Sequence, residues 1–157
     1  MEPLRVYIET TIPSAYFDER TTPEMIRRRE ATRRWWADAV DTCARVTSSV
    51  VREELKKGPP HRRTAWLDLI EGLPDLSAVP AIRPILLSYH RHKLMPEDDA
   101  FHLALASFHR CDFLVTWDRK HLANPNKFRH IRGVNTRLRL FVPRIVSPSD
   151  LLGGDHA

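Results

Sequence analysis

The stretch Pro96–His121, PEDDAFHLALASFHRCDFLVTWDRKH, decides the fold that this sequence predicts. Asp98 and Asp99 precede an apolar series that fits a helix with a broad buried face. Residues 112–117, DFLVTW, form a nearly continuous apolar run, which is typical of a strand in a parallel sheet covered on both faces. Asp118 follows at the carboxyl end of this strand, the edge where open α/β sheets place their ligands. One acid opens a helix and another ends a strand, so both can face one crevice.

The rest of the chain repeats this alternation of short apolar runs and longer helical patterns. Strands are predicted at 4–8, 45–47, 76–79, 112–117 and 144–146. Helices are predicted at 23–44, 50–57, 62–73, 81–92, from Pro96 onward, at 126–140 and at 147–152. Pro13 and Ser14 indicate a loop after the first strand, and Ser48 or Ser49 can cap the second helix. Strands that alternate with helices of this length predict βαβ units and a parallel sheet.

Length and composition indicate one domain that spans residues 1–152, with a frayed tail at 153–157. The 157 residues suffice for a real core, and no run of about 18 apolar residues could span a bilayer. The N-terminal residues have no secretory pattern, and the two cysteines have no framework spacing, so we expect reduced thiols and a cytoplasmic protein. The formal charge of +5 is compatible with binding a polyanion but does not establish it.

Arginines crowd the predicted helix at 23–44, at positions 27, 28, 29, 33 and 34. They form either a solvated face paired with Glu24, Glu30 and Asp38 or a surface that meets RNA or a partner. The sequence leaves both interpretations open.

Four acids fall at predicted strand ends and helix starts: Glu9, Glu54, Asp99 and Asp118, with Asp98 nearby. Glu53 and Glu54 lie about 100° apart on a helix, so only one of them can face the same crevice. Converging carboxylates repel each other unless a cation neutralises them. Hard divalent ions such as Mg²⁺ or Mn²⁺ take oxygen ligands, and the chemistry that they support best here is phosphodiester hydrolysis.

Each acid also has a simpler interpretation. Asp98 and Asp99 suit a helix N-terminus without any metal, Asp118 can be an N-cap, and Glu54 can be a surface charge. His102 falls one turn after Asp99, where it either contacts that acid or simply packs. His121 closely follows Asp118 and either touches the substrate or packs. No set of His and Cys has structural-zinc spacing, and no serine-nucleophile or glycine-rich phosphate motif is present.

Several segments in this order resemble the PIN-domain family, and in particular the VapC toxins of type II toxin–antitoxin systems. The matching segments are VYIETTIPS (6–14), TSSVVREELKKG (47–58), EDDAFHLALA (97–106), DFLVTWDRKHLAN (112–124) and RIVSPSDLL (144–152). The resemblance covers residues 4–152. It implies a three-layer α/β/α sandwich with a central, mostly parallel sheet.

The resemblance also implies roles for single residues. The family's four acids map onto Glu9, Glu54, Asp99 and Asp118, which would hold one or two Mg²⁺ or Mn²⁺ ions. Thr10 and Thr116 match the hydroxyl residues beside the first and last acid. The first acid of the family is usually Asp, so Glu9 is a departure whose longer side chain requires the metal or the strand to shift.

The implied function is that of a metal-dependent endoribonuclease, the toxin of a pair, which binds RNA and an antitoxin protein and forms a homodimer. Trp35, Trp36 and Trp66 give the dimer loose support. Two rivals stay open at this point. One is a PIN-like binding or dimerisation module weakened in catalysis by the change at Glu9, and the other is a metal-dependent DNA nuclease that uses the same site.

Overall fold

The computed structural model describes residues 2–153. In chain order the elements are β1 (Leu4–Ile8), α1 (Thr11–Tyr16), α2 (Pro23–Thr42), β2 (Cys43–Ser48), α3 (Ser49–Lys56), α4 (Pro60–Ile70), β3 (Asp75–Leu76), α5 (Ile82–Arg91), α6 (Glu97–Phe108), β4 (Phe113–Val115), α7 (Pro125–Arg137), β5 (Arg144–Val146) and α8 (Pro148–Leu152). Most of the expected tail, residues 154–157, lies outside the described residues.

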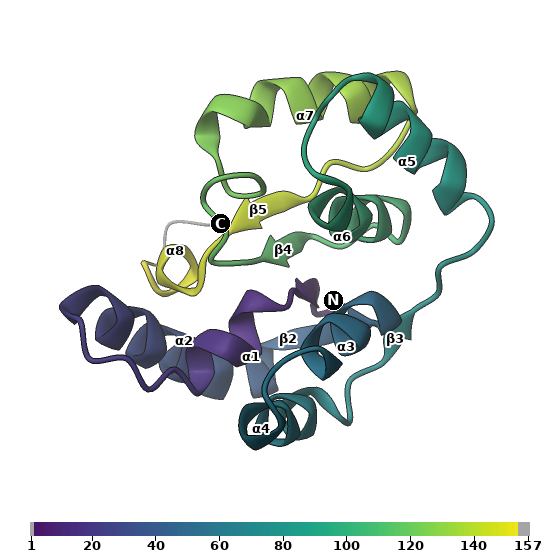
Figure 1. Cartoon of the computed structure of the whole chain (residues 1–157). Coiled ribbons are helices and arrows are strands. Elements are labelled where there is room, and N and C mark those ends of the chain that lie inside the picture. The colour runs from purple at the N-terminus through teal and green to yellow at the C-terminus, as the bar shows by residue number, and fades with distance from the viewer. Residues whose placement is uncertain (1, 154–157) are drawn as a thin grey trace.

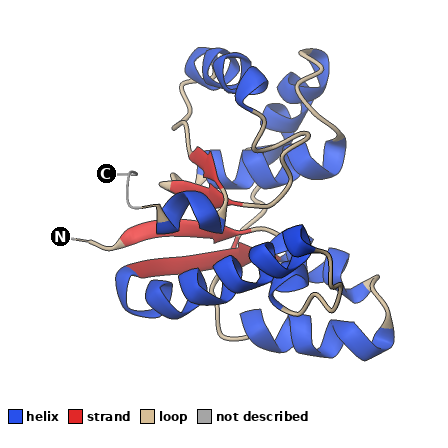
Figure 2. Ribbon diagram, turned by 90° about the vertical axis from the view of Figure 1, so that its left-hand side faces the viewer, coloured by secondary structure: helices blue, strands red, loops and turns tan. Residues whose placement is uncertain are grey.

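The five strands form one sheet in the order β3-β2-β1-β4-β5, and every neighbouring pair is parallel. Helices α1 to α4 cover one face of the sheet, and α5 to α7 cover the other, as Figures 1 and 2 show. The three-layer α/β/α sandwich with a parallel sheet is therefore confirmed. The strand order reverses between β1 and β4, so the topological switch point, where such sheets bind ligands, lies between these two central strands.

The core lies between these layers and is densest around the two central strands. Val6, Tyr7 and Ile8 of β1 and Leu114 and Val115 of β4 have no exposed surface. Helix α6 is buried on most of its circumference, and its small Ala100, Ala104 and Ala106 let it pack against the sheet. The apolar runs at 4–8 and 112–117 therefore form strands that are covered on both faces.

Local signals define where the helices begin. Side chains cap α2 from Thr22, α3 from Ser48, α7 from Asn124 and α8 from Ser147, each accepting a hydrogen bond from a backbone N–H of the first turn. The expected cap of α3 is thus Ser48 and not Ser49. Gly58 ends that helix, and a Cβ there would lie 2.3 Å from the Trp66 ring.

One predicted loop is wrong, because residues 11–16 form helix α1. Pro13 occupies the third position of this helix, where its missing N–H costs nothing since first-turn donors have no intrahelical acceptor. The strands predicted at 4–8 and 144–146 agree with β1 and β5, and the ends predicted for the other elements differ from the structure by at most three residues. The three tryptophans expected to support a dimer are core residues, with 5% to 9% of their surface exposed. Among residues 2–153, no helix has the length and apolarity that a membrane crossing requires.

Candidate active site

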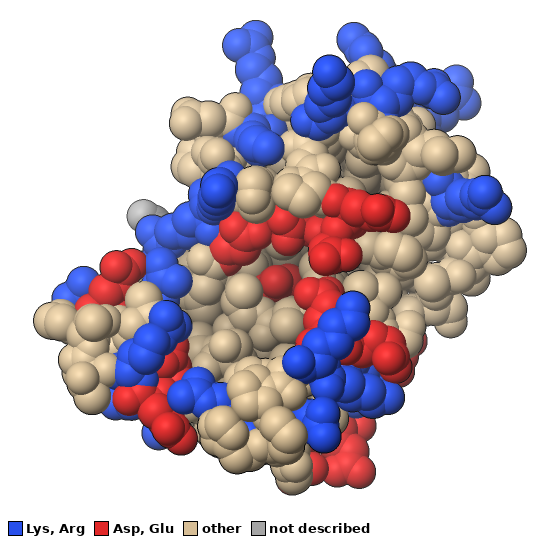
Figure 3. Space-filling view, in the orientation of Figure 1, with Lys and Arg blue, Asp and Glu red and all other residues tan. Residues whose placement is uncertain are grey.

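The four predicted acids come from four different elements that meet at the carboxyl edge of the sheet. Ile8 pairs with Val115, so the residues that follow these strands, Glu9 and Thr116, leave β1 and β4 side by side. Glu54 lies on the second turn of α3, and Asp99 lies in the first turn of α6. Figure 3 shows Asp and Glu side chains gathered in a hollow at the middle of this face, with Lys and Arg side chains around it.

Glu9 is a buried carboxylate, with 4% of its surface exposed, and one of its oxygens is saturated by donors. Oε1 accepts hydrogen bonds from the Thr11 N–H at 2.9 Å, the Thr11 hydroxyl at 2.5 Å and the Thr116 hydroxyl at 2.8 Å. Burial raises the pKa of Glu9, while His102 and these hydrogen bonds offset part of the rise. Because Oε1 is fixed in this way, Oε2 is the oxygen left for another ligand.

Thr11 is a site residue that the sequence reasoning missed in favour of its neighbour Thr10. The Thr11 hydroxyl contacts Glu9, and it also accepts a hydrogen bond from the Trp117 N–H at 2.8 Å. The Thr10 hydroxyl is buried without a hydrogen-bond partner among the described residues. The signal was present in the chain, because a threonine two residues after a strand-end acid can reach back to it from a helix start, but the helix itself was not predicted.

Asp99 and Asp118 face each other across the crevice. The pKa of Asp99 is raised to about 7, first by partial burial and then by the negative charges of Asp118 and Glu9. Among residues 2–153, no Lys or Arg forms an ion pair with Glu9, Asp99 or Asp118. The imidazole of His102 lowers the pKa of Glu9 and Asp99 in part, but no Lys or Arg among the described residues balances this cluster of negative charge.

Asp118 combines two of the roles weighed for it. Its Oδ1 accepts hydrogen bonds from the backbone N–H groups of Lys120 at 3.0 Å and His121 at 3.1 Å, so it caps the turn after β4. Its own N–H donates to the Thr116 hydroxyl at 2.9 Å. These hydrogen bonds occupy Oδ1 of Asp118, so Oδ2 is the oxygen available on the side of Asp99. His121 thus contacts Asp118 through its backbone N–H.

Glu54, and not its neighbour Glu53, is drawn toward the interior. Glu53 is exposed and pairs with Lys56 at 3.2 Å. Oε1 of Glu54 lies 2.6 Å from Nε2 of His102, and both atoms are buried with no other polar partner among the described residues. The ring N–H is not aligned with the oxygen, so the contact is a close ion pair and not a linear hydrogen bond.

His102 is almost completely buried, with 1% of its surface exposed, and it is surrounded by acids. Burial by itself lowers the pKa of a histidine, but the contact with Glu54 and the charges of Glu9, Glu54 and Asp99 reverse the effect and raise it. The histidine is thus part of the acidic site. Asp98, predicted as a supporting residue, is exposed and makes no side-chain contact with the four acids.

The residues present fit a hard divalent cation in their chemistry. All four donors are carboxylates, and at least Glu9 and Asp118 each have one oxygen engaged and one available. Within residues 2–153, no three Asp, Glu, His or Cys side chains already stand in a metal-ligating arrangement.

Arginines of α2 mostly serve the fold. Arg28 pairs with Glu24 at 3.0 Å, and Arg29 and Arg33 donate to backbone carbonyls of the segment before α2. The guanidinium groups of Arg28 and Arg119 also lie over the Trp117 ring, 5.3 and 5.7 Å from its centre. The structure thus favours a paired face for part of this set and places Arg119 beside the acids.

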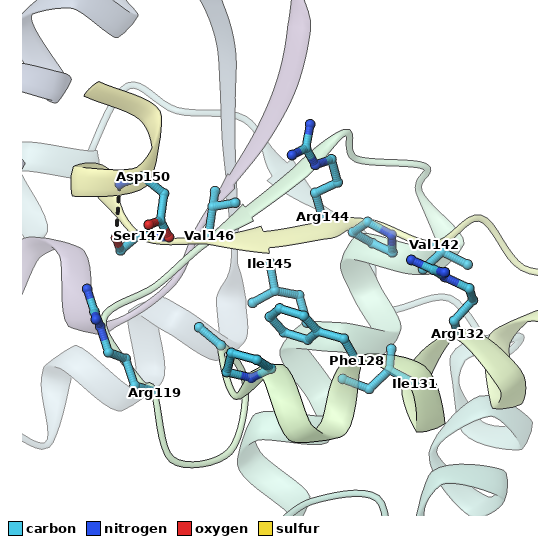
Figure 4. Close-up of a pocket in the computed structure, with 13 residues that line it drawn as sticks. Arg119, Phe128, Ile131, Arg132, Val142, Arg144, Ile145, Val146, Ser147 and Asp150 are labelled. Atoms are coloured by element: carbon cyan, nitrogen blue, oxygen red, sulfur yellow. Dashed lines mark hydrogen bonds between the residues drawn. The ribbon is translucent and has the colours of Figure 1, made fainter. Parts of the chain in front are cut away.

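A separate cavity of about 780 Å³ lies between α7 and β5 (Figure 4). Phe128 and Ile131 of α7 face Ile145 of β5 across it, and Arg119 and Arg132 lie at its ends. None of the four acids lines it. The only acid there, Asp150, forms the capping box of α8 with Ser147.

Comparisons with known proteins agree with this architecture. No family model and no curated protein matches the chain. Among solved structures, the chain is similar to one in the crystal structure of VapBC2 from Rickettsia felis bound to a DNA fragment from their promoter. The match has a TM-score of 0.53 at 13% sequence identity and covers 92% of this chain and 98% of that one. This protein thus shares the PIN-like α/β/α fold of a chain in that VapBC2 structure.

Proposed function

We propose that this protein is a Mg²⁺- or Mn²⁺-dependent endoribonuclease, the toxin of a toxin–antitoxin pair, with Glu9, Glu54, Asp99 and Asp118 at its active site. One observation carries the proposal. Asp99 is partly buried beside Asp118 and Glu9, without a Lys or Arg partner in the described chain, and its pKa rises to about 7 as a result. Such a cluster is costly in an isolated protein and is stabilised when a cation binds.

A bound divalent ion would supply positive charge for the phosphate and a more acidic water. The chain's own residues prepare the site for it. Thr11 and Thr116 hold Oε1 of Glu9 and direct the remaining oxygen to the crevice. The turn capped by Asp118 keeps that carboxylate opposite Asp99. In the proposed hydrolysis, the water oxygen bonds to phosphorus and the bond to the 3′ oxygen breaks, which leaves a 3′-hydroxyl and a 5′-phosphate.

The basic surroundings of the hollow support a polyanionic substrate. Exposed Arg119 and Lys120 directly follow Asp118, and the chain carries a net charge of +5. Figure 3 shows Lys and Arg side chains around the acids, and in the proposed complex they would contact phosphates on either side of the cleaved bond. We infer RNA as the substrate from the resemblance to VapC toxins, and a DNA arm in the experiment tests that choice.

The proposed partners follow from the same resemblance. The solved neighbour is a VapBC complex, and we propose that this chain also has an antitoxin partner. We further propose a homodimer, supported by the apolar patch of Leu86, Leu87 and Met95 around a cavity of about 360 Å³ between α5 and α6. Leu87 has 55% of its surface exposed and is the most exposed large apolar side chain among the described residues. Light scattering during size-exclusion chromatography tests the dimer.

The decisive experiment is cleavage of a mixture of structured RNAs in Mg²⁺ or Mn²⁺ by wild type and by Asp99→Asn, with an EDTA control and a matched single-stranded DNA. The expected result is RNA cleavage by wild type that both controls abolish, with 5′-phosphate ends on the products. Equal cleavage of the DNA would indicate the rival DNA nuclease. Cleavage that survives in Asp99→Asn would show that these acids are not the active site.

The rival binding module makes a different prediction about metal. A domain that has lost its metal site should show no Mn²⁺-dependent rise in melting temperature, whereas an ion that binds only the folded protein raises it. A folded protein that neither cleaves RNA nor gains stability with Mn²⁺ would support the binding module.

A further inference from the structure

A buried row of polar side chains, Ser48, Tyr7 and His102, lies behind the four acids. The Ser48 and Tyr7 hydroxyl oxygens are 2.7 Å apart, and the Tyr7 oxygen is 2.7 Å from Nδ1 of His102. On its other side, Nε2 of His102 is 2.6 Å from Oε1 of Glu54. Ser48 and Tyr7 are fully buried. Burying so many polar groups in the core is costly unless each is satisfied, so a role for this row is expected.

The direction of hydrogen bonding along the row follows the protonation state of His102. The Ser48 oxygen accepts from the Val51 N–H at 3.3 Å and shares a hydrogen bond with the Tyr7 hydroxyl. When the imidazole is neutral, Tyr7 can donate to Nδ1, which puts the ring proton on Nε2, toward Glu54. When the imidazole is charged, Nδ1–H donates to the Tyr7 oxygen and Nε2 also carries a proton. In both states a protonated Nε2 lies 2.6 Å from Oε1 of Glu54, although its N–H is not aligned with that oxygen.

The row also connects the elements that carry the acids. Ser48 caps α3, which bears Glu54, and Tyr7 lies two residues before Glu9 on β1. His102 lies one turn after Asp99 on α6. The Tyr7 and His102 rings pack with their centres 5.6 Å apart, which leaves little freedom for the imidazole. A displacement of His102 would therefore change the position of the Glu54 carboxylate first.

We propose that His102 is a positioning residue that, supported by Tyr7 and Ser48, fixes the Glu54 carboxylate beside the other three acids and thereby sets the affinity of the site for a divalent ion. This inference rests on the proposed function. A glutamate on an exposed helix samples many rotamers, and ordering it during metal binding costs entropy. The contact with His102 orders the Glu54 side chain before the ion binds. Removing a residue that holds a metal ligand in place typically lowers the metal affinity by 10- to 100-fold.

The experiment measures the Mn²⁺ dissociation constant by isothermal titration calorimetry for wild type, Tyr7→Phe, His102→Leu and His102→Gln. Tyr7→Phe and His102→Leu should weaken Mn²⁺ binding by about tenfold. His102→Gln should recover part of the loss, because its amide can donate to Glu54 where leucine cannot. Tyr7→Phe keeps the ring that packs against the imidazole, so it tests the hydroxyl with little change in the core.

Two controls separate positioning from general stability. Tyr89→Phe removes another fully buried tyrosine hydroxyl, bonded to Asn135 at 2.5 Å and remote from the acids, and it should leave the Mn²⁺ affinity within twofold of wild type. In a Glu54→Gln background, Tyr7→Phe should have no further effect on Mn²⁺ affinity, because a residue that acts through Glu54 has nothing left to position.

The outcomes distinguish this inference from the proposed function. If wild type binds Mn²⁺, Asp99→Asn does not, and the His102 and Tyr7 variants bind as well as wild type, the positioning role is overturned and the nuclease site stands. The positioning role is also overturned if Tyr89→Phe weakens Mn²⁺ binding as much as Tyr7→Phe does. It is overturned as well if Tyr7→Phe still weakens Mn²⁺ binding tenfold in the Glu54→Gln background. If wild type binds no Mn²⁺ at all, both proposals fail.

Discussion

The Thr116 hydroxyl donates to Oε1 of Glu9 at 2.8 Å and ties the end of β4 to the end of β1 at the point where the strand order reverses. Thr11 adds two further donors to the same oxygen. These three contacts explain how the site accommodates a glutamate where the resembling family usually has an aspartate. The longer side chain reaches the start of α1 and is held there by the Thr11 and Thr116 donors.

Replacing Thr116 by valine should destabilise the protein before any metal is added. The change removes a donor to buried Glu9 and the acceptor of the Asp118 N–H, at a cost of about 1–3 kcal/mol in the free energy of unfolding. Urea unfolding at neutral pH measures it. Thr116→Ser keeps the hydroxyl and should lose less than about 1 kcal/mol. Equal stability of the two variants would show that these hydrogen bonds contribute little.

The metal-free protein should become less stable as the pH rises from about 4 to about 7. The pKa of Asp99 is raised in the folded state to about 7, so the folded protein binds its proton more tightly than the unfolded chain and loses stability as this proton dissociates. We expect a contribution of at most about 2 kcal/mol, because solvent screens this partly exposed group.

The measurement compares urea unfolding of wild type and Asp99→Asn across that range, in EDTA. Asparagine cannot ionise, so the variant should lose this part of the pH dependence and be the more stable protein at pH 8. With saturating Mn²⁺ the order should reverse, because metal binding requires the carboxylate. Parallel pH profiles for the two proteins in EDTA would contradict the prediction.

Two substitutions of Asp118 separate its capping role from its negative charge. Asp118→Asn keeps the oxygen that accepts from Lys120 and His121, so it should retain wild-type stability while RNA cleavage is lost. Asp118→Ala removes both functions and should also cost about 1 kcal/mol of unfolding free energy, as for other lost caps. Urea unfolding combined with the cleavage assay distinguishes them. Full cleavage by Asp118→Asn would leave Asp118 as a cap alone.

RNA binding should depend on salt through the basic residues beside the acids. The Asp99→Asn variant is expected to bind RNA without cutting it. In that background, Arg119→Ala and Lys120→Ala should each weaken binding and lower the slope of log affinity against log salt by about 1. Arg137→Ala is the matched control, because the end of α7 leads to the amino end of β5, at the opposite edge of the sheet. Fluorescence anisotropy at several salt concentrations gives the slopes, and an equal effect at Arg137 would indicate non-specific binding.

Much of the fold could be read from the chain because its signals are local. The apolar runs LRVYI and DFLVT alternate with capped helical patterns, which indicates parallel strands with helices between them. The exception, α1, is short and contains Pro13, so its pattern resembles a loop. A helix of six residues is stabilised by its packing against the rest of the protein and has little signal of its own.

The sequence by itself determined which acids stand at strand ends and helix starts, because the position of a residue in its own element is a local property. Helical periodicity allowed only one of Glu53 and Glu54 to face the crevice, and the resemblance to the PIN-domain family pointed to Glu54. Only the tertiary structure decided that Thr11 and not Thr10 holds Glu9, and that His102 joins Tyr7 to Glu54. These contacts link residues on separate elements, and whether two such side chains meet depends on how the sheet and helices pack, which no single segment encodes.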